Sequence, residues 1–314
     1  GVVANEKGFT YARCNRTHIP ALALGGYRAA LPVKSFFTPA HEELTEPDRK
    51  LVKRIVVGIK NCDLLALPAL DAIYNEPDFP DAYYANKRAN TLIIATDCTA
   101  AGATCFCTQW SNEPYPGGNH DVAVSELPDG MLLVAAATEA GRQFIATGGL
   151  QATAATADQA ARRDAQRRQV SAAVSAQNAA YTFGRNDLPA FEQKFDAKQW
   201  QEAAKPCVVC GGCTHVCPTC HCFFIRDHIG STDFAREKHW DSCQYTGYGR
   251  VAGGGNPRPK IHERLRNRYY CKTVHRPERV KTLCCTGCGR CIAACQGKID
   301  MRRVLTDVLA GDGK

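Results

Sequence analysis

The sequence has little of what marks a membrane or secreted protein. Its 314 residues contain no run approaching the ~18 to 20 uncharged apolar residues of a membrane-spanning helix. The first residues, GVVANEKGF, lack the apolar core of a secretory signal peptide. We therefore expect a cytoplasmic protein without a membrane span, in a compartment where thiols stay reduced.

Catalytic and nucleotide-binding signatures are also missing. The chain shows no recognisable Ser-His-Asp set, no paired carboxylates in a catalytic frame and no phosphate-cradling loop. The Gly-rich stretch at 246–259, TGYGRVAGGGNPRP, lacks the strand-to-helix context of a dinucleotide fingerprint, so we expect a loop there. The sequence gives no indication that this chain has a substrate site of its own.

The formal net charge of +8 raises the alternative of nucleic-acid binding. Its basic residues are scattered, apart from RRDAQRR at 162–168 and HERLRNRYYCK at 262–272. The count also treats every cysteine as neutral, and thiolates bound to metal clusters would cancel much of the excess. We therefore expect no nucleic-acid partner.

Four short segments rich in Val, Ile and Leu indicate strands in the first 140 residues. They lie at 54–60, 91–97, 121–127 and 131–137. The last two are joined by Pro-Asp-Gly and predict a hairpin. Apolar residues at helical spacing in 63–76 predict a crossover helix between the first two strands, which would then be parallel. Residues 1–140 are thus predicted to form an α/β domain.

The composition changes to Ala, Gln, Arg and Asp between 141 and 205. Residues 157–181 contain neither Gly nor Pro and predict a solvent-facing helix. We interpret 141–205 as a helical linker, with a partner-docking helix as the alternative. The remaining segment, 206–314, is rich in cysteine.

The density of cysteine in 207–222 is compatible with disulfides, zinc or iron–sulfur clusters. Its spacing is C-x2-C-x2-C-x3-C followed by Pro218, and the same cysteine spacing recurs near the C-terminus. In this pattern three cysteines bind one cubane and the fourth reaches the neighbouring cluster. The predicted ligands are Cys207, Cys210, Cys213 and Cys295 for the first [4Fe–4S] cluster, and Cys285, Cys288, Cys291 and Cys217 for the second.

This spacing predicts an α+β ferredoxin-like fold for 206–314, with a long insertion at 218–284. A zinc site would instead favour two C-x2-C pairs per metal, without a fixed fourth cysteine before Pro. Gln296 replaces the usual Pro after the second motif. We expect that difference to alter packing or reduction potential more than cluster assembly.

Four more cysteines follow the first two predicted strands: Cys62, Cys98, Cys105 and Cys107. Parallel neighbouring strands end at the same sheet edge, so these thiols are expected to converge there and bind a third [4Fe–4S] cluster. The alternative is that they are small buried hydrophobic residues. For the other six we favour packing beside a cluster over ligation: Cys14, Cys220, Cys222, Cys243, Cys271 and Cys284. Three histidines are interpreted as packing or surface residues: His215, His221 and His239.

Several stretches together resemble the iron–sulfur beta subunit of cytoplasmic NiFe-hydrogenase/sulfhydrogenase complexes, a family that also includes an iron–sulfur subunit of anaerobic sulfite reductase. They include VVGIKNCDLLALPALD, YYANKRANTLIIATDCTAAGATCFC, CVVCGGCTHVCPTCHCF, HWDSCQYTGYGRVAGGGNPRP and CTGCGRCIAAC. The resemblance covers most of the chain and fails mainly in 141–199. The sequence after CFC, with TQW and SNEPYPGGNH, also departs from the family.

The resemblance implies a non-catalytic subunit that relays electrons within an oxidoreductase complex. One partner would be a flavin/NAD(P) diaphorase subunit carrying FAD and NAD(P). The other would be the NiFe-hydrogenase small and large subunits or another catalytic metal subunit. The alternatives are a subunit of an anaerobic sulfite reductase or of a heterodisulfide-reductase-linked flavin oxidoreductase, and, less favoured, a structural zinc protein that binds nucleic acid.

Overall fold

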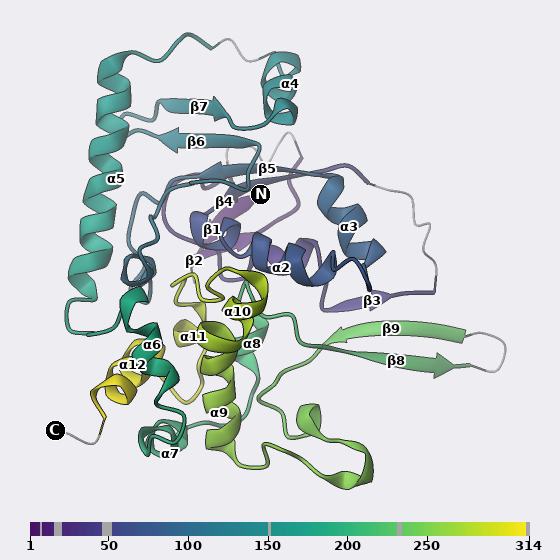
Figure 1. The fold of residues 1–314 in the computed structure, drawn as a ribbon. Coiled ribbons are helices and arrows are strands. Elements are labelled where there is room, and N and C mark those ends of the chain that lie inside the picture. The colour runs from purple at the N-terminus through teal and green to yellow at the C-terminus, as the bar shows by residue number, and fades with distance from the viewer. Residues whose placement is uncertain (7, 16–20, 46–51, 150–151, 231–233, 312–314) are drawn as a thin grey trace.

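A computed structural model describes residues 1–6, 8–15, 21–45, 52–149, 152–230 and 234–311. A twisted sheet with its helices forms one half of the molecule, and a mainly helical, cysteine-rich half lies beside it (Figure 1). This arrangement confirms the predicted mixed α/β organisation. None of the helices in these ranges is long and apolar enough to cross a membrane.

The sheet is built from the four predicted strands. They are β4 (Arg54–Ile59), β5 (Thr91–Thr96), β6 (Val122–Glu126) and β7 (Leu132–Ala136), in that spatial order. β4, β5 and β6 are parallel, whereas β6 and β7 form the predicted antiparallel hairpin. The carboxyl ends of β4 and β5 therefore meet at one edge, as the sequence predicted.

Three helices cover one face of this sheet: α1 (Asn61–Leu64), α2 (Leu67–Tyr74) and α3 (Ala82–Ala89). The helix predicted over 63–76 is divided in two. Pro68 lies in the first turn of α2, where its missing N–H leaves no helical hydrogen bond unmade, so a new helix begins there. Beneath these helices is a core that includes Phe37, Leu67 and Ile93.

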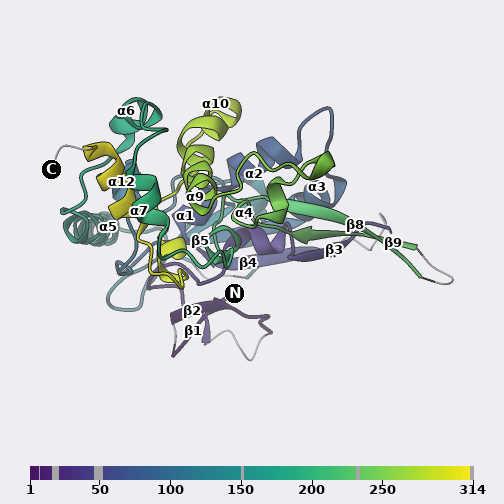
Figure 2. The same ribbon diagram turned by 90° about the horizontal axis from the view of Figure 1, so that it is seen from below.

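The opposite face of the sheet is only partly covered. Helix α4 (Glu139–Thr147) packs Phe144 and Ile145 against it. The N-terminal hairpin of β1 (Val2–Asn5) and β2 (Gly8–Tyr11) stands to one side (Figure 2). Between them lies an apolar cavity of about 1160 Å³.

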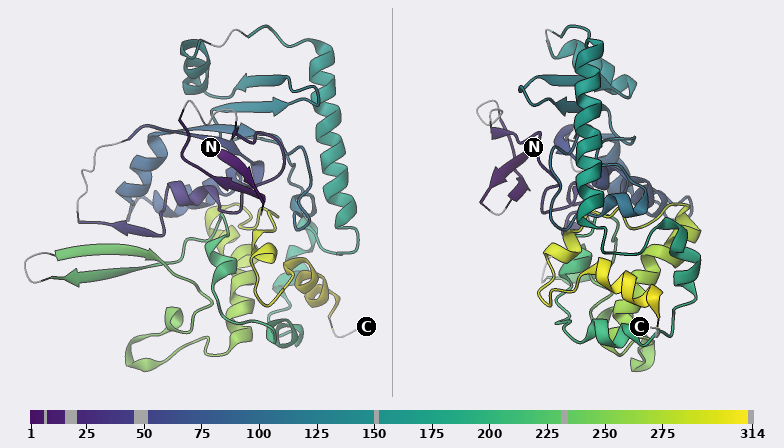
Figure 3. Two further views of the ribbon diagram at one scale, coloured as in Figure 1. Left: turned by 180° about the vertical axis from the view of Figure 1, so that it is seen from behind. Right: turned by 90° about the vertical axis from the view of Figure 1, so that its left-hand side faces the viewer.

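The helix predicted over 157–181 is present as α5 (Ala157–Gln177) and runs along the side of the molecule (Figure 3). Most of its surface faces solvent, as expected. Val170 and Val174 are nevertheless buried against loops that carry predicted cysteine ligands. Arg167 also forms a bidentate ion pair with Asp97, at 2.8 and 2.9 Å. The helix is thus packed onto the α/β half in addition to linking two parts of the chain.

The C-terminal half is a group of short helices around buried aromatic residues, among them Trp200, Tyr269 and Tyr270. The helices are α6 (Leu188–Glu192), α7 (Gln199–Ala204), α8 (Gly212–His215), α9 (Ile261–Tyr270), α10 (Arg276–Val280), α11 (Arg290–Ala293) and α12 (Met301–Ala310). A π-helical segment, Cys271–His275, connects α9 to α10. The segment 246–259, predicted as a loop, holds only two short 3₁₀ turns.

The predicted insertion contains a long β-hairpin, β8 (Phe223–Ile229) and β9 (Phe234–Trp240), which we call the arm. The arm projects from the body (Figures 1 and 2). At its base β9 also pairs with β3 (His41–Glu43) from the N-terminal half. This three-stranded sheet joins segments that are almost two hundred residues apart.

Candidate metal centres

The two cysteine motifs fold into loops of the same backbone form. In the first, Val209 and Gly211 have positive φ angles of 58° and 71°; in the second, Gly287 and Gly289 have 68° and 69°. These residues occupy equivalent positions between the first three cysteines of each motif. Left-handed residues at these points turn the chain tightly, and a short helix follows each loop, α8 in one case and α11 in the other. The repeated spacing in the sequence therefore corresponds to a repeated structure.

The first cysteine cavity combines residues from both motifs. Its lining includes Cys207, Cys210, Cys213, Cys291 and Cys295. Three of these come from the first motif, and Cys295 is the fourth cysteine of the second. Cys210 is exposed, so this cavity lies near the surface.

The second cysteine cavity also combines residues from both motifs, with their roles exchanged. Its lining includes Cys217, Cys285, Cys288 and Cys291, so the fourth cysteine of the first motif joins the first three of the second. Three of these four residues are buried, and Cys291 is partly buried. Both sets predicted for crossed ligation are thus brought together around cavities.

The third cysteine cavity lies at the carboxyl ends of β4 and β5. Its lining includes Cys62, Cys98, Cys105, Cys107 and Cys288. Burial raises the pKa of Cys98 to about 11, so this thiol remains protonated unless a metal displaces the proton. All four cysteines predicted for a third site therefore surround one space.

The loop bearing Cys105 and Cys107 is in direct contact with the second motif. The Phe106 amide donates to the Gly287 carbonyl at 2.8 Å. A Cβ atom on Gly289 would lie 1.9 Å from the Thr104 carbonyl oxygen, so only glycine allows this approach. The third cavity is held against the second by backbone contact.

The three cavities form a consecutive series. Cys291 borders the first and the second, and Cys288 borders the second and the third. The second cavity is therefore in the middle. This order follows from residues that belong to two linings at once.

The spacing of the sulfur atoms does not fit a mononuclear zinc site. Zinc–sulfur bonds of about 2.3 Å place tetrahedral ligands ~3.8 Å apart. All eighteen cysteines lie in the described ranges, and among them no three sulfurs are mutually within 4.8 Å. A cubane holds its cysteine sulfurs farther apart, because each binds a different iron. No compact group of sulfurs for a single zinc ion is therefore present in the described ranges, and the expectation of clusters rests on the C-x2-C-x2-C-x3-C spacing.

Three buried cations lie at or beside the second cavity, and in the part of the chain that the structure describes none of them is paired with a carboxylate. Arg268 and Lys272 are 4% and 2% exposed. The Lys272 ammonium donates to Cys217 Sγ at 3.0 Å and to Cys220 Sγ at 3.3 Å. In Arg276, also buried, Nε and Nη2 have no hydrogen-bond partner. A buried cation is costly without a counter-charge, and cubanes with four thiolates supply negative charge at this place.

The pKa values of Cys217 and Lys272 reflect the attraction between the buried cation and the thiolates. A hydrogen bond from the Cys220 thiol lowers the pKa of Cys217 well below its ordinary value, against the effect of burial, and Lys272 lowers it further. Burial acts to lower the pKa of Lys272, but Cys217 and Cys220 outweigh it and hold that pKa well above its ordinary value. The residues around Cys217 thus favour its thiolate, the form that binds metal.

Sequence reasoning missed the role of the basic segment 262–272. Four basic residues recur every four positions and share one helical face, which is buried. They are Arg264, Arg268, Lys272 and Arg276. In a polar surface helix such charges would point to solvent. The regular spacing of basic residues between the two cysteine motifs was the signal that could have indicated a basic helical face turned toward the clusters.

Of the remaining cysteines, Cys220, Cys243 and Cys284 are buried, and Cys14, Cys222 and Cys271 are partly buried. The side chains of Cys222 and Cys243 are hydrogen-bonded to each other. None of these six lines the three cavities.

The three histidines also lie outside the cavity linings. Burial lowers the pKa of His221 to about 3, and His215 packs near Trp240 and Tyr245. His239 lies at the base of the arm. None of these three histidines is placed to replace a cysteine ligand at the three cavities.

Comparison with known proteins gives two matches. A model of the 4Fe–4S dicluster domain matches residues 206–299, which implies two [4Fe–4S] clusters there. The sulfhydrogenase 2 subunit beta of Pyrococcus furiosus is 31% identical over 321 aligned residues, which cover 99% of this chain and 92% of that protein. No solved structure matches the chain.

Proposed function

This chain belongs to the family of sulfhydrogenase beta subunits, and we propose that it relays electrons inside a multi-subunit oxidoreductase of the hydrogenase type. Residues 206–314 would form the ferredoxin-like dicluster domain, residues 1–140 the α/β domain, and 141–205 the connection between them. The chain would transfer electrons without converting a substrate itself.

The proposed ligands follow the cavity linings. The first cluster would be bound by Cys207, Cys210, Cys213 and Cys295, and the second by Cys285, Cys288, Cys291 and Cys217. A third [4Fe–4S] cluster would be bound by Cys62, Cys98, Cys105 and Cys107. Cys291 and Cys288 also touch neighbouring cavities, and we assign both to the second cluster because their motif spacing requires it.

The observation that carries this proposal is the continuous series of cavities. Each pair of neighbouring cavities has one lining cysteine in common. The cysteines of the middle cavity are the most buried, and the first cavity includes the exposed Cys210. A relay requires such an order, with a shielded centre and ends that partners can approach.

When bound, the clusters supply one-electron transfer. The chain's own residues provide the environment. Burial of Cys217, Cys285 and Cys288 excludes water from the middle site. Lys272 and Arg268 stabilise the added negative charge of a reduced state, because they are cations held close in a medium of low dielectric constant.

Partner subunits would supply the remaining chemistry. We place FAD and NAD(P) on a diaphorase subunit, and the catalytic metal on NiFe-hydrogenase small and large subunits or another catalytic subunit. Exposed apolar side chains on the arm, Ile225, Ile229 and Phe234, and the open sheet face support assembly with other proteins. We further propose a cytoplasmic location, because none of the eighteen cysteines forms a disulfide bond.

The isolated, cluster-loaded chain provides the test. It should accept electrons from dithionite, with bleaching of the cluster absorption, yet should not oxidise NADH or NADPH in the presence of an artificial dye. Adding the flavin-containing partner should restore NAD(P)H-dependent reduction of the clusters. Rapid NAD(P)H oxidation by the isolated flavin-free chain would refute the relay assignment.

A further inference from the structure

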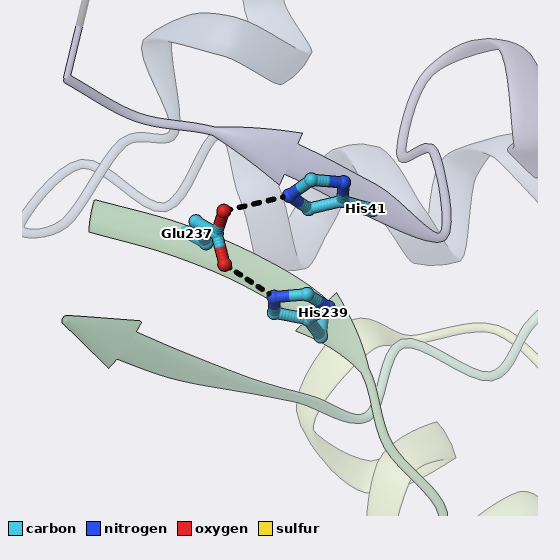
Figure 4. A group of neighbouring side chains, drawn as sticks. All are labelled: His41, Glu237 and His239. Atoms are coloured by element: carbon cyan, nitrogen blue, oxygen red, sulfur yellow. Dashed lines mark hydrogen bonds and ion pairs between the residues drawn. The ribbon is translucent and has the colours of Figure 1, made fainter. Parts of the chain in front are cut away.

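Two histidines and a glutamate meet at the base of the arm, away from the cysteine cavities. His41 Nε2 lies 3.2 Å from Glu237 Oε1, and His239 Nε2 lies 3.0 Å from Glu237 Oε2. Figure 4 shows both imidazoles turned toward the same carboxylate. One donor atom from each residue lies within 4.8 Å of the other two, and this is the only such group of three His, Cys, Asp or Glu residues in the described ranges.

Strand pairing places these three side chains on one face. His41 of β3 lies directly opposite His239 of β9, and Glu237 is two residues before His239 on the same strand. Opposed residues and residues two apart project to the same side of a sheet. The register of β3 and β9 therefore creates the group.

Ring stacking fixes the two imidazoles. The rings of His41 and His239 are 4.6 Å apart and inclined by 11°. The other face of His239 stacks on Phe224 of β8, at 5.1 Å and 12°. Each imidazole is thus oriented by packing, with its Nε2 directed at the carboxylate.

We propose that His41, His239 and Glu237 form a binding site for a divalent transition-metal ion such as Zn²⁺. The ion would be bound by the two Nε2 atoms and the carboxylate, and would replace their direct contacts of 3.2 and 3.0 Å. Imidazole and carboxylate are common zinc ligands, and three protein ligands leave a coordination position for water. Sulfur takes no part, which separates this site from the cluster sites.

Charged residues lie opposite Glu237 on both neighbouring strands. Glu43 lies opposite Glu237 across β3 and β9, and Arg226 lies opposite Glu237 across β8 and β9. Glu237 itself supplies a negative charge directly to the ion. A bound ion would connect β3 of the N-terminal half to β9 of the arm, so the site would fix the arm to the body.

The test uses the cluster-loaded chain without a polyhistidine tag. Titration calorimetry with Zn²⁺ should detect one site per chain, and zinc X-ray absorption should show nitrogen and oxygen ligands without sulfur. His41→Ala and His239→Ala should each weaken binding by at least about tenfold, because losing even a residue that only supports a metal ligand has an effect of that size. His228→Ala is the matched control, because His228 is exposed on β8 outside the group.

Two further readouts separate binding from misfolding. Each variant should keep the wild-type cluster absorption and circular dichroism. Zinc should also slow amide exchange in residues 41–43 of the wild type, with no such effect in His41→Ala. The proposal is overturned if His41→Ala and His239→Ala bind zinc as the wild type does, or if the bound zinc has sulfur ligands.

Discussion

Arg290 and Asp63 form a buried, two-pronged ion pair, with Nη1–Oδ1 at 3.0 Å and Nη2–Oδ2 at 2.5 Å. Both side chains are 1% exposed. Each residue adjoins a cysteine, because Asp63 follows Cys62 and Arg290 precedes Cys291. The pair therefore connects the cysteine site of the α/β half to the second cysteine motif.

Asp63→Asn should destabilise the protein by about 3 to 5 kcal/mol, because it leaves the Arg290 guanidinium buried without its counter-charge. Urea denaturation followed by circular dichroism under anaerobic conditions measures the change. Glu76→Gln is the control, since Glu76 and Arg279 form an exposed pair at 2.6 Å that should contribute only about 0 to 1 kcal/mol. Equal effects of the two substitutions would contradict the connecting role of the buried pair.

Lys272→Met should lower the reduction potential of the second cluster, because the variant loses a buried cation 3.0 Å from Cys217 Sγ. A redox titration monitored by EPR measures this potential. Lys272→Arg keeps the charge and should remain closer to the wild type, and Lys53→Met, at an exposed position, should have no effect. An unchanged or raised potential in fully loaded Lys272→Met would show that the ammonium does not stabilise the reduced state.

Crossed ligation predicts which cluster each fourth cysteine serves. Cys217→Ala should disturb the cluster held by Cys285, Cys288 and Cys291, whereas Cys295→Ala should disturb the other one. EPR spectra of the two reduced variants should therefore lose different signals. A structure of the loaded protein in which each motif closes its own cluster would overturn this assignment.

Gly289→Ala should prevent normal assembly of the second and third sites, since the new Cβ would lie 1.9 Å from the Thr104 carbonyl oxygen. Gly253→Ala is a close control: Gly253 has a similar positive φ of 82° but no atom within 4 Å of the added Cβ. The control should therefore show only the backbone strain, about 1 to 3 kcal/mol, with full iron content. If both variants keep full iron content, the close approach is not required for assembly.

The regular features of this fold could be predicted from the sequence because they depend on local patterns. Short runs of Val, Ile and Leu located β4 and β5, and the room for a helix between them gave their parallel pairing. The spacing of Cys207, Cys210 and Cys213 fixed a tight loop in the same way. These signals lie within a few residues of each other.

The contacts between distant segments could not be predicted. Nothing in the sequence near Gly289 indicates that Thr104 will pack against it. No strand was predicted in 223–240, so the pairing of the arm with β3 was not foreseen either. Val170 and Val174 are two apolar residues in a mostly polar helix, so their burial depends on the loop they meet. Such contacts are decided by tertiary packing, which overrides local preference.

The iron content of the fully reconstituted chain tests the central claim most directly, namely that a line of three clusters runs from the dicluster domain into the α/β half. Three cubanes predict about twelve irons per chain, at four per cubane, and two predict about eight. The double variant Cys105→Ala and Cys107→Ala should lose about four irons and keep the EPR signals of the other two clusters. A wild type that saturates at about eight irons, with no loss in the double variant, would contradict the claim and restrict the line to the two sites around Cys217 and Cys295.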